Sequence, residues 1–157
     1  MKGKPTSAAL IKEFLGKYPP AITRDVQSAR RVLKRLVPHG FELVYDNYNT
    51  LAFGFSPTER AGGAIVSIAA YPKWVTLFFL HGKRLKDPEG LLQGSGARVR
   101  SIRLAPVTLI DTKPVQDLLR QALEPHRPEL AAAPPLSSVV KSVSARQRPR
   151  RPAVRRR

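Results

Sequence analysis

The chain has 157 residues, no cysteine and a formal net charge of +17. The lack of cysteine excludes disulfides and thiolate metal sites, and no apolar run approaches the about 20 residues that a membrane-spanning helix needs. A charge balance this basic favours polyanionic partners such as nucleic acid. We therefore expect a cytoplasmic protein with one folded domain and a basic extension.

Two helices are expected at the start of the chain, and the first of them is short and amphipathic. Thr6 or Ser7 can cap the first helix, which ends before Tyr18. Thr23 can cap the second helix, and Pro38 stops it. The second helix also carries a basic ridge, which is typical of the solvated face of a surface helix and consists of Arg24, Arg30, Arg31, Lys34 and Arg35.

The middle of the chain predicts an antiparallel sheet of about five strands. The expected strands are rich in β-branched and aromatic residues and are separated by turn residues; they cover 41–45, 50–55, 64–70, 74–80 and 99–104. The central hairpin, 64–80, is apolar on both faces, so each face needs a cover. Helices are expected on one face, and a ligand, a partner or a second copy in a homodimer on the other.

The last part of the chain divides into a helix and a basic tail. Asp111 or Thr112 can cap a helix that ends near Glu124. Residues 125–157 contain nine lysines and arginines against one acid and have little apolar content, which predicts disorder. The expected domains are thus 1–124 and a tail at 125–157. The predicted fold class is α+β, with two N-terminal helices, a curved antiparallel sheet, a C-terminal helix and a disordered tail.

A glycine and arginine segment is the first candidate for anion binding. Gly94 and Gly96 let backbone N–H groups approach an anion, and Arg98 and Arg100 are two residues apart on an expected strand. Guanidinium groups that project from one face can hold phosphate or carboxylate bidentately. The alternative is a glycine loop with solvated arginines, because the segment lacks the spacing of a P-loop.

A second candidate lies at the mouth of the sheet, where two hairpin turns meet. We define the sheet-mouth residues as Tyr45, Asp46, Tyr48 and Trp74. Aromatic side chains among positive charge can stack unpaired bases, and Asp46 beside Tyr45 could orient a small polar ligand. The alternative is that these aromatic residues belong to the core.

The tail is a candidate for nonspecific binding of nucleic acid. Neutralising about eight phosphates would give log K against log salt a slope near −7 on duplex DNA. The same side chains could bind ribosomal RNA or anionic lipid, or could have no selected role. The arginines that carry this prediction are Arg146, Arg148, Arg150, Arg151, Arg155, Arg156 and Arg157.

The histidines give no pattern for catalysis or metal binding. His39, His81 and His126 are scattered singly, without metal-ligand spacing, and no nucleophile elbow is present. His39 and His81 follow or precede strands and could approach one another. We expect no metal, no cofactor and no catalytic residue that the sequence can name.

The order of the segments resembles the YdhG-like family, a small bacterial domain of unknown function. The resemblance covers roughly residues 6–124 and depends on 42–48, 51–55, the central hairpin, 85–96 and 100–104. It implies an α+β fold with a curved antiparallel sheet backed by helices. Some frataxin-like members are regarded as iron chaperones with acidic surfaces, whereas the first two helices here contain only Glu13 and Asp25 as acids.

These observations favour a non-enzymatic binding module for an anionic or small polar ligand, with a tail that adds affinity for nucleic acid. Two alternatives remain open at this point. One is a frataxin-like protein that handles iron, which the resemblance implies. The other is a small enzyme that uses Asp46, Tyr48 or a histidine in a pocket, which requires these side chains to converge on one cavity.

Overall fold

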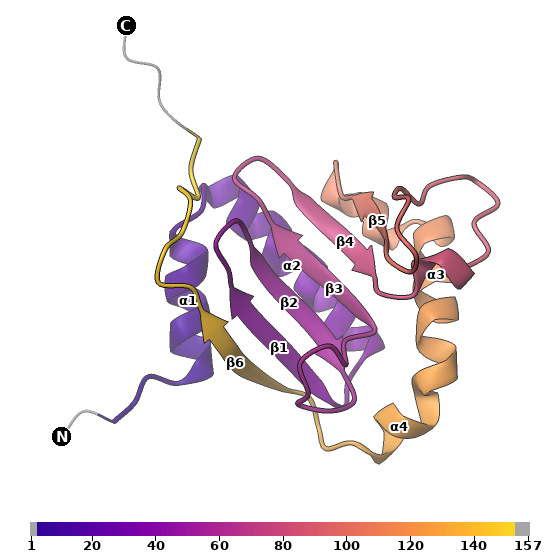
Figure 1. Cartoon of the computed structure of the whole chain (residues 1–157), viewed down its shortest axis with the longest axis horizontal. Helices are drawn as coiled ribbons and strands as arrows, with labels where there is room; N and C mark the ends of the chain where they lie inside the picture. The colour runs from indigo at the N-terminus through magenta and orange to yellow at the C-terminus, as the bar shows by residue number, and fades with distance from the viewer. Residues whose placement is uncertain (1–2, 153–157) are drawn as a thin grey trace, which may run out of the picture.

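A six-stranded sheet with helices against one face forms the protein in a computed structural model that describes residues 3–152 (Figure 1). The strand order is β5-β4-β3-β2-β1-β6, and every neighbouring pair is antiparallel except β1 and β6. The helices are α1 (Ser7–Gly16), α2 (Pro20–Leu36), α3 (Lys113–Leu123) and α4 (Arg127–Ala132). The strands are β1 (Phe41–Asp46), β2 (Leu51–Ser56), β3 (Val66–Ala70), β4 (Val75–Phe79), β5 (Arg100–Arg103) and β6 (Ser137–Val143).

The first two helices begin for different reasons. The Thr6 side chain accepts a hydrogen bond from the backbone N of Ala9 at 3.1 Å, so it caps α1 as predicted. The second helix begins at Pro20, in the first helical position, where a missing N–H costs nothing. Thr23 is therefore inside α2 and not its cap, and its hydroxyl donates to the carbonyl oxygen of Leu15 at 2.9 Å.

The helix-facing side of the sheet is apolar and forms the core. One row of this side runs across five strands, and each member is paired in register with the next: Val44, Phe53, Ile68, Leu77 and Ile102. All five are at most 6% exposed, and they share one cluster with buried residues of α1, α2 and α3. The prediction that helices cover one face of the sheet is therefore confirmed.

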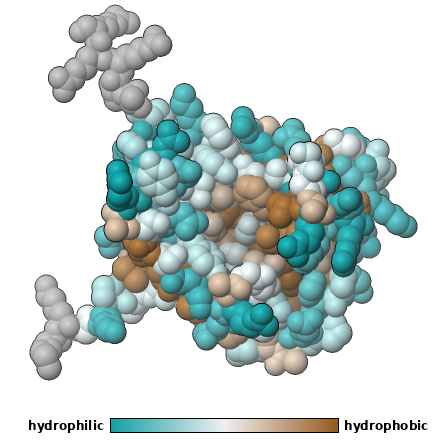
Figure 2. All heavy atoms as spheres, in the orientation of Figure 1, coloured by the Kyte–Doolittle hydropathy of each residue, from teal (hydrophilic) through white to brown (hydrophobic). Residues whose placement is uncertain are grey.

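The opposite side of the sheet differs from the apolar surface expected from the sequence. A row in register on this side consists of Arg103, Thr76, Ala69, Ala52 and Tyr45, with the smallest side chains in the middle. In Figure 1 the loop after β2 crosses one end of this side, and Figure 2 shows hydrophobic residues exposed in its middle among hydrophilic ones. The second face is thus mixed in character and largely open.

The structure differs from the sequence-based expectation beyond Glu124. Residues predicted as a disordered tail form α4 and then β6, which pairs in parallel with β1 and makes the sheet one strand wider than expected. An edge strand obtains its backbone hydrogen bonds from the neighbouring strand, so it needs little apolar burial of its own. Arg155, Arg156 and Arg157 lie outside the described residues.

None of the helices within residues 3–152 combines the length and the apolar character that crossing a membrane requires. The longest of them, α2, carries charged residues along its exposed side.

Candidate ligand pocket

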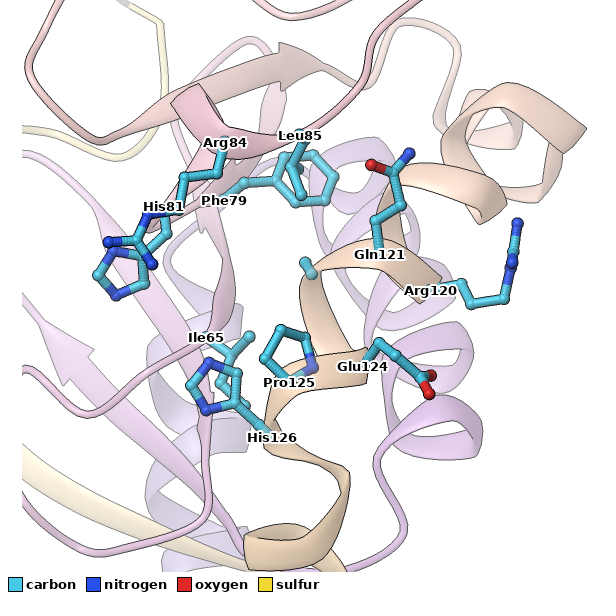
Figure 3. Close-up of a pocket in the computed structure, with 11 residues that line it drawn as sticks. Ile65, Phe79, His81, Arg84, Leu85, Arg120, Gln121, Glu124, Pro125 and His126 are labelled. Carbon is cyan, nitrogen blue, oxygen red and sulfur yellow. The ribbon is translucent and has the colours of Figure 1, made fainter.

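A pocket of about 740 Å³ lies where the end of β4 meets the end of α3 (Figure 3). Its volume is in the range of small-molecule sites, about 300 to 1,000 Å³. Ile65 and Phe79, which are 4% and 0% exposed, contribute apolar surface from the sheet. Further apolar surface comes from Leu85, which follows β4 in the chain, and from Ala122 and Pro125 at the end of α3.

Local chain geometry fixes the walls of this pocket. A short 3-10 turn, η1 (Gly82–Arg84), follows β4 and directs His81 and Arg84 to the pocket. Gly82 is required there, because a Cβ at this position would lie 2.5 Å from the Cβ of Arg100. On the other wall, both amide atoms of Gln121 bond to the backbone of Lys86, at 2.9 and 3.0 Å, which ties the chain after η1 to α3.

Two imidazoles and one guanidinium group lie on one side of the pocket. Figure 3 shows His81, Arg84 and His126 together on that side, whereas the ends of Arg120 and Glu124 point away from the cavity. Within residues 3–152, the ion pairs of the structure leave the Arg84 guanidinium without a carboxylate. The pocket therefore has an apolar part and a basic side.

His39 and His81, which the sequence suggested could approach one another, line different pockets. Nδ1 of His39 donates to the carbonyl oxygen of Ala133 at 2.9 Å, and His39 lies at the start of the sheet. His81 instead shares its pocket with His126, which the sequence placed in the tail. No group of three metal-ligating side chains that could hold an ion occurs among the described residues.

The glycine and arginine segment is only partly available for an anion. Strand β5 begins at Arg100, so Arg98 precedes the strand and the two arginines do not form the predicted pair on one strand face. Nη1 of Arg100 donates to the carbonyl oxygens of Gly96 and Val99, at 2.6 and 2.8 Å. Gly94 has φ of 126°, a conformation that favours glycine. Anion binding at this segment stays a prediction.

The sheet-mouth residues do not converge. Asp46 lies on the helix-facing side of the sheet, whereas its neighbour Tyr45 lies on the open side. Tyr48 is 52% exposed in the turn after β1. Trp74 stacks on Tyr71 with ring centroids 5.1 Å apart, and the guanidinium carbon of Arg103 lies 4.0 Å from its ring centroid. The aromatic surface that Trp74 could offer to a base is thus already in use.

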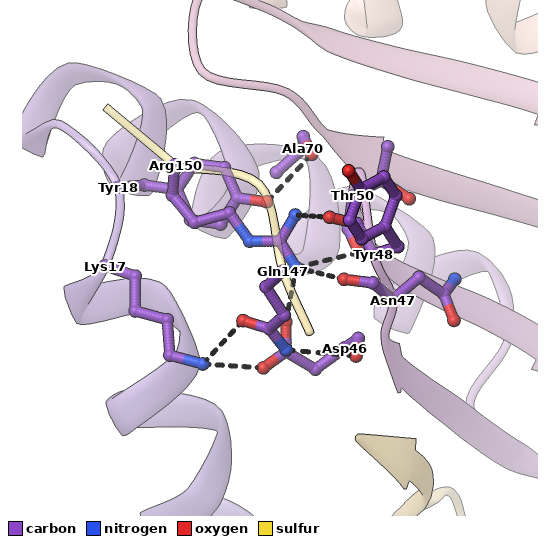
Figure 4. Close-up of polar contacts among 9 residues, drawn as sticks. All are labelled: Lys17, Tyr18, Asp46, Asn47, Tyr48, Thr50, Ala70, Gln147 and Arg150. Atoms are coloured by element: carbon purple, nitrogen blue, oxygen red, sulfur yellow. Dashed lines mark hydrogen bonds and ion pairs between the residues drawn. The ribbon is translucent and has the colours of Figure 1, made fainter. Parts of the chain in front are cut away.

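Asp46 is the centre of a buried ion cluster (Figure 4). Its two carboxylate oxygens accept from Nζ of Lys17 and from Nη2 of Arg150, each at 2.8 Å. Burial alone would raise the pKa of Asp46, but the hydrogen bonds from Lys17 and Arg150 outweigh it and the pKa is lowered. A carboxylate held in this way is a structural group and has no free oxygen to orient a ligand.

The described tail arginines have three different environments. Arg146 and Arg148 are exposed, whereas Arg150 is buried beside Asp46. Arg151 donates to the carbonyl oxygens of Gly16 and Lys17 at the end of α1, both at 3.3 Å. Composition alone could not separate these roles, because each arginine has similar neighbours in the sequence.

Comparison with known proteins adds no relative, since no protein-family model, curated protein or solved structure matches the chain. The resemblance to the YdhG-like family therefore stays a prediction. The pocket as a unit could not be predicted from the sequence, because its walls come from residues 65, 79–85 and 120–126, which only the folded sheet brings together.

Proposed function

We propose that this protein is a cytoplasmic, non-enzymatic binding module, of the YdhG-like kind, for a small amphipathic anion. The observation that carries the proposal is the pocket of about 740 Å³, which combines an apolar wall with His81, Arg84 and His126 on one side. Sites of this type are largely apolar with a few polar groups that fix the orientation of the ligand.

Both parts of the ligand have a physical reason to bind. Burying an aliphatic body against Ile65 and Phe79 contributes about 0.8 kcal/mol per CH₂ group. A negative head group near Arg84 gains a charge-assisted hydrogen bond, which is stronger than a neutral one. A neutral apolar molecule lacks the second contribution, and a small hydrophilic anion lacks the first.

We also propose that the basic tail binds nucleic acid, but through fewer arginines than the sequence suggested. Arg150 is bound to Asp46, and Arg151 bonds to the end of α1, so fewer arginines of the tail are free for phosphate than the sequence suggested. We expect weak, sequence-independent binding of duplex DNA with a salt slope shallower than about −7.

Calorimetry with octanoate tests the pocket. We expect the wild-type protein to bind octanoate and the Ala122→Trp variant to lose binding, because the indole would fill the cavity that Ala122 lines. Ala21→Trp, on the exposed side of α2, is the matched control and should bind as the wild type does. Circular dichroism checks that both variants fold. Unchanged binding by Ala122→Trp would contradict the proposal, and so would a wild-type protein that binds neither octanoate nor its phosphate analogue, octyl phosphate.

Acid–base catalysis is a second candidate because His81 and His126 line one pocket. Imidazole groups can exchange a proton with a bound substrate near neutral pH. The test is hydrolysis of p-nitrophenyl phosphate and p-nitrophenyl acetate by the wild type, His81→Asn and His126→Asn. Equal rates for the three proteins would remove this candidate. The frataxin-like alternative depends on the family resemblance alone.

A further inference from the structure

A second cavity, of about 330 Å³, shares two residues with the pocket. His81 and His126 line both cavities, so the two spaces meet at these histidines. The rest of the second cavity comes mainly from the loop between β2 and β3, through residues 57–58 and 60–64, with Glu129 at its side.

The two cavities differ in chemistry. The second cavity is lined by the hydroxyl-bearing Thr58, by Arg60 and by the backbone of Gly62 and Gly63. Gly62 has φ of 85°, and a Cβ on Gly63 would lie 2.9 Å from Oγ of Ser56, so the loop needs both glycines. Backbone that carries no side chains leaves this wall polar and open to a compact head group.

We propose that the ligand is an amphipathic phosphate monoester that spans both cavities, an inference that rests on the proposed function. Its apolar body lies against Ile65 and Phe79, and its phosphate lies beyond the two histidines, between Arg84 and Arg60. A phosphate monoester carries up to two charges and three terminal oxygens. Two guanidinium groups can donate hydrogen bonds to all three of these oxygens, whereas a carboxylate would offer them only two.

Positively charged side chains outnumber negatively charged ones around the proposed phosphate position. Within the described residues, the ion pairs leave Arg60 and Arg84 without a carboxylate. Glu129 is the carboxylate of the second cavity, and its Oε1 lies 3.6 Å from Nδ1 of His126. The guanidinium groups of Arg60 and Arg84 thus outnumber this one carboxylate around the proposed phosphate position.

Calorimetry with a matched ligand series tests this inference. The probes are octyl phosphate, octanoate, octanol and inorganic phosphate, at one pH and ionic strength. We expect octyl phosphate to bind about tenfold more tightly than octanoate, and the other two to bind more weakly than either. Arg60→Gln and Arg84→Gln should each reduce the preference for phosphate over carboxylate. Arg31→Gln, on the exposed side of α2, is the control with the same loss of charge and should leave the preference unchanged.

The outcomes separate the two proposals. If octanoate binds and octyl phosphate binds no better, or if Arg60→Gln leaves the preference intact, the phosphate inference is wrong while the proposed function stands. If neither octanoate nor octyl phosphate binds, both are wrong. Vesicles with and without phosphatidic acid distinguish the source of the phosphate: vesicle binding that Arg60→Gln weakens indicates a lipid head group, and binding of octyl phosphate alone indicates a soluble ester.

Discussion

The guanidinium of Arg150 lies 2.8 Å from the carboxylate of Asp46, although 104 positions separate the two residues in the chain. The two side chains are 3% and 0% exposed. The same guanidinium donates to the carbonyl oxygens of Asn47 and Thr50 in the turn after β1. This arrangement attaches the C-terminal segment to the β1–β2 hairpin, so residues 144–152 are part of the fold.

Arg150→Ala should therefore destabilise the protein. The substitution leaves the buried Asp46 carboxylate with Lys17 as its one cation, and breaking a buried ion pair costs about 3 to 5 kcal/mol. Because Lys17 remains, we expect the lower end of that range, measured as the free energy of unfolding in urea. Arg148→Ala removes an exposed arginine of the same segment and should change it by less than about 0.5 kcal/mol. Equal stabilities of the two variants would contradict the role of Arg150.

Removing β6 should have a larger effect than any single substitution in the tail. A chain that ends at residue 136 loses the parallel partner of β1, the Arg150 contact with Asp46 and the hydrogen bond from Ser138 to Glu42. We expect this chain to unfold at a clearly lower temperature in circular dichroism or to be unfolded at 25 °C. A chain that ends at residue 152 is the control and should melt as the full chain does. Coincident melting of the two truncated chains would show that β6 does not stabilise the sheet.

Most of the elements could be predicted because each depends on local sequence. The strands from 41–45 to 99–104 follow alternation and turn residues, and the structure shifts their ends by one or two residues. Strand β6 could not be predicted in this way. Its residues are mostly exposed, and what makes them a strand is the backbone of β1, nearly a hundred residues away in sequence.

The candidate site was harder to predict for the same physical reason. The sequence predicted that Asp46 could orient a small polar ligand, whereas the structure pairs its carboxylate with Lys17, at the end of α1, and with Arg150 of the C-terminal segment. Composition treats Arg150 and Arg148 alike, although the structure buries one and exposes the other. The pocket depends on the packing of α3 against the sheet, which no local pattern encodes.

Acid should destabilise the fold through two buried carboxylates. Burial would raise the pKa of Glu42, but the hydrogen bonds and charge of Arg30, together with a hydrogen bond from Ser138, lower it from the ordinary value of 4.5. The pKa of Asp46 is likewise lowered from its ordinary value of 3.8. A lowered pKa means that the stabilisation is fully present above these ordinary values and is lost as the pH falls below them. We expect the free energy of unfolding to fall steeply below about pH 4.5.

Two variants test this assignment. Asp46→Asn should be less stable at pH 7 and should lose less stability on acidification, because one of the two carboxylates is gone. Glu59→Gln, in the exposed loop after β2, should keep the acid dependence of the wild type. If Asp46→Asn showed the same dependence as the wild type, the acid sensitivity would have another origin.

Tyr18 should make the fold lose stability at alkaline pH. Burial raises its pKa from 10.0 to about 12, against an opposing effect of Arg150, and its hydroxyl donates to the carbonyl oxygen of Ala70 at 3.0 Å. Because the fold favours the neutral phenol, this stabilisation is complete below pH 10 and is lost as the pH rises toward about 12. Tyr18→Phe should cost about 1 kcal/mol at neutral pH, the typical contribution of one hydrogen bond.

The difference between the wild-type and Tyr18→Phe absorbance titrations at 295 nm isolates the ionisation of this phenol. Its midpoint should lie near pH 12 and coincide with the loss of near-ultraviolet circular dichroism, because ionising the phenol requires the core between α1 and β3 to open. The phenylalanine variant should unfold with less dependence on pH between 10 and 12. A midpoint at the ordinary value of 10.0 in a chain that is still folded would show that Tyr18 is accessible to water.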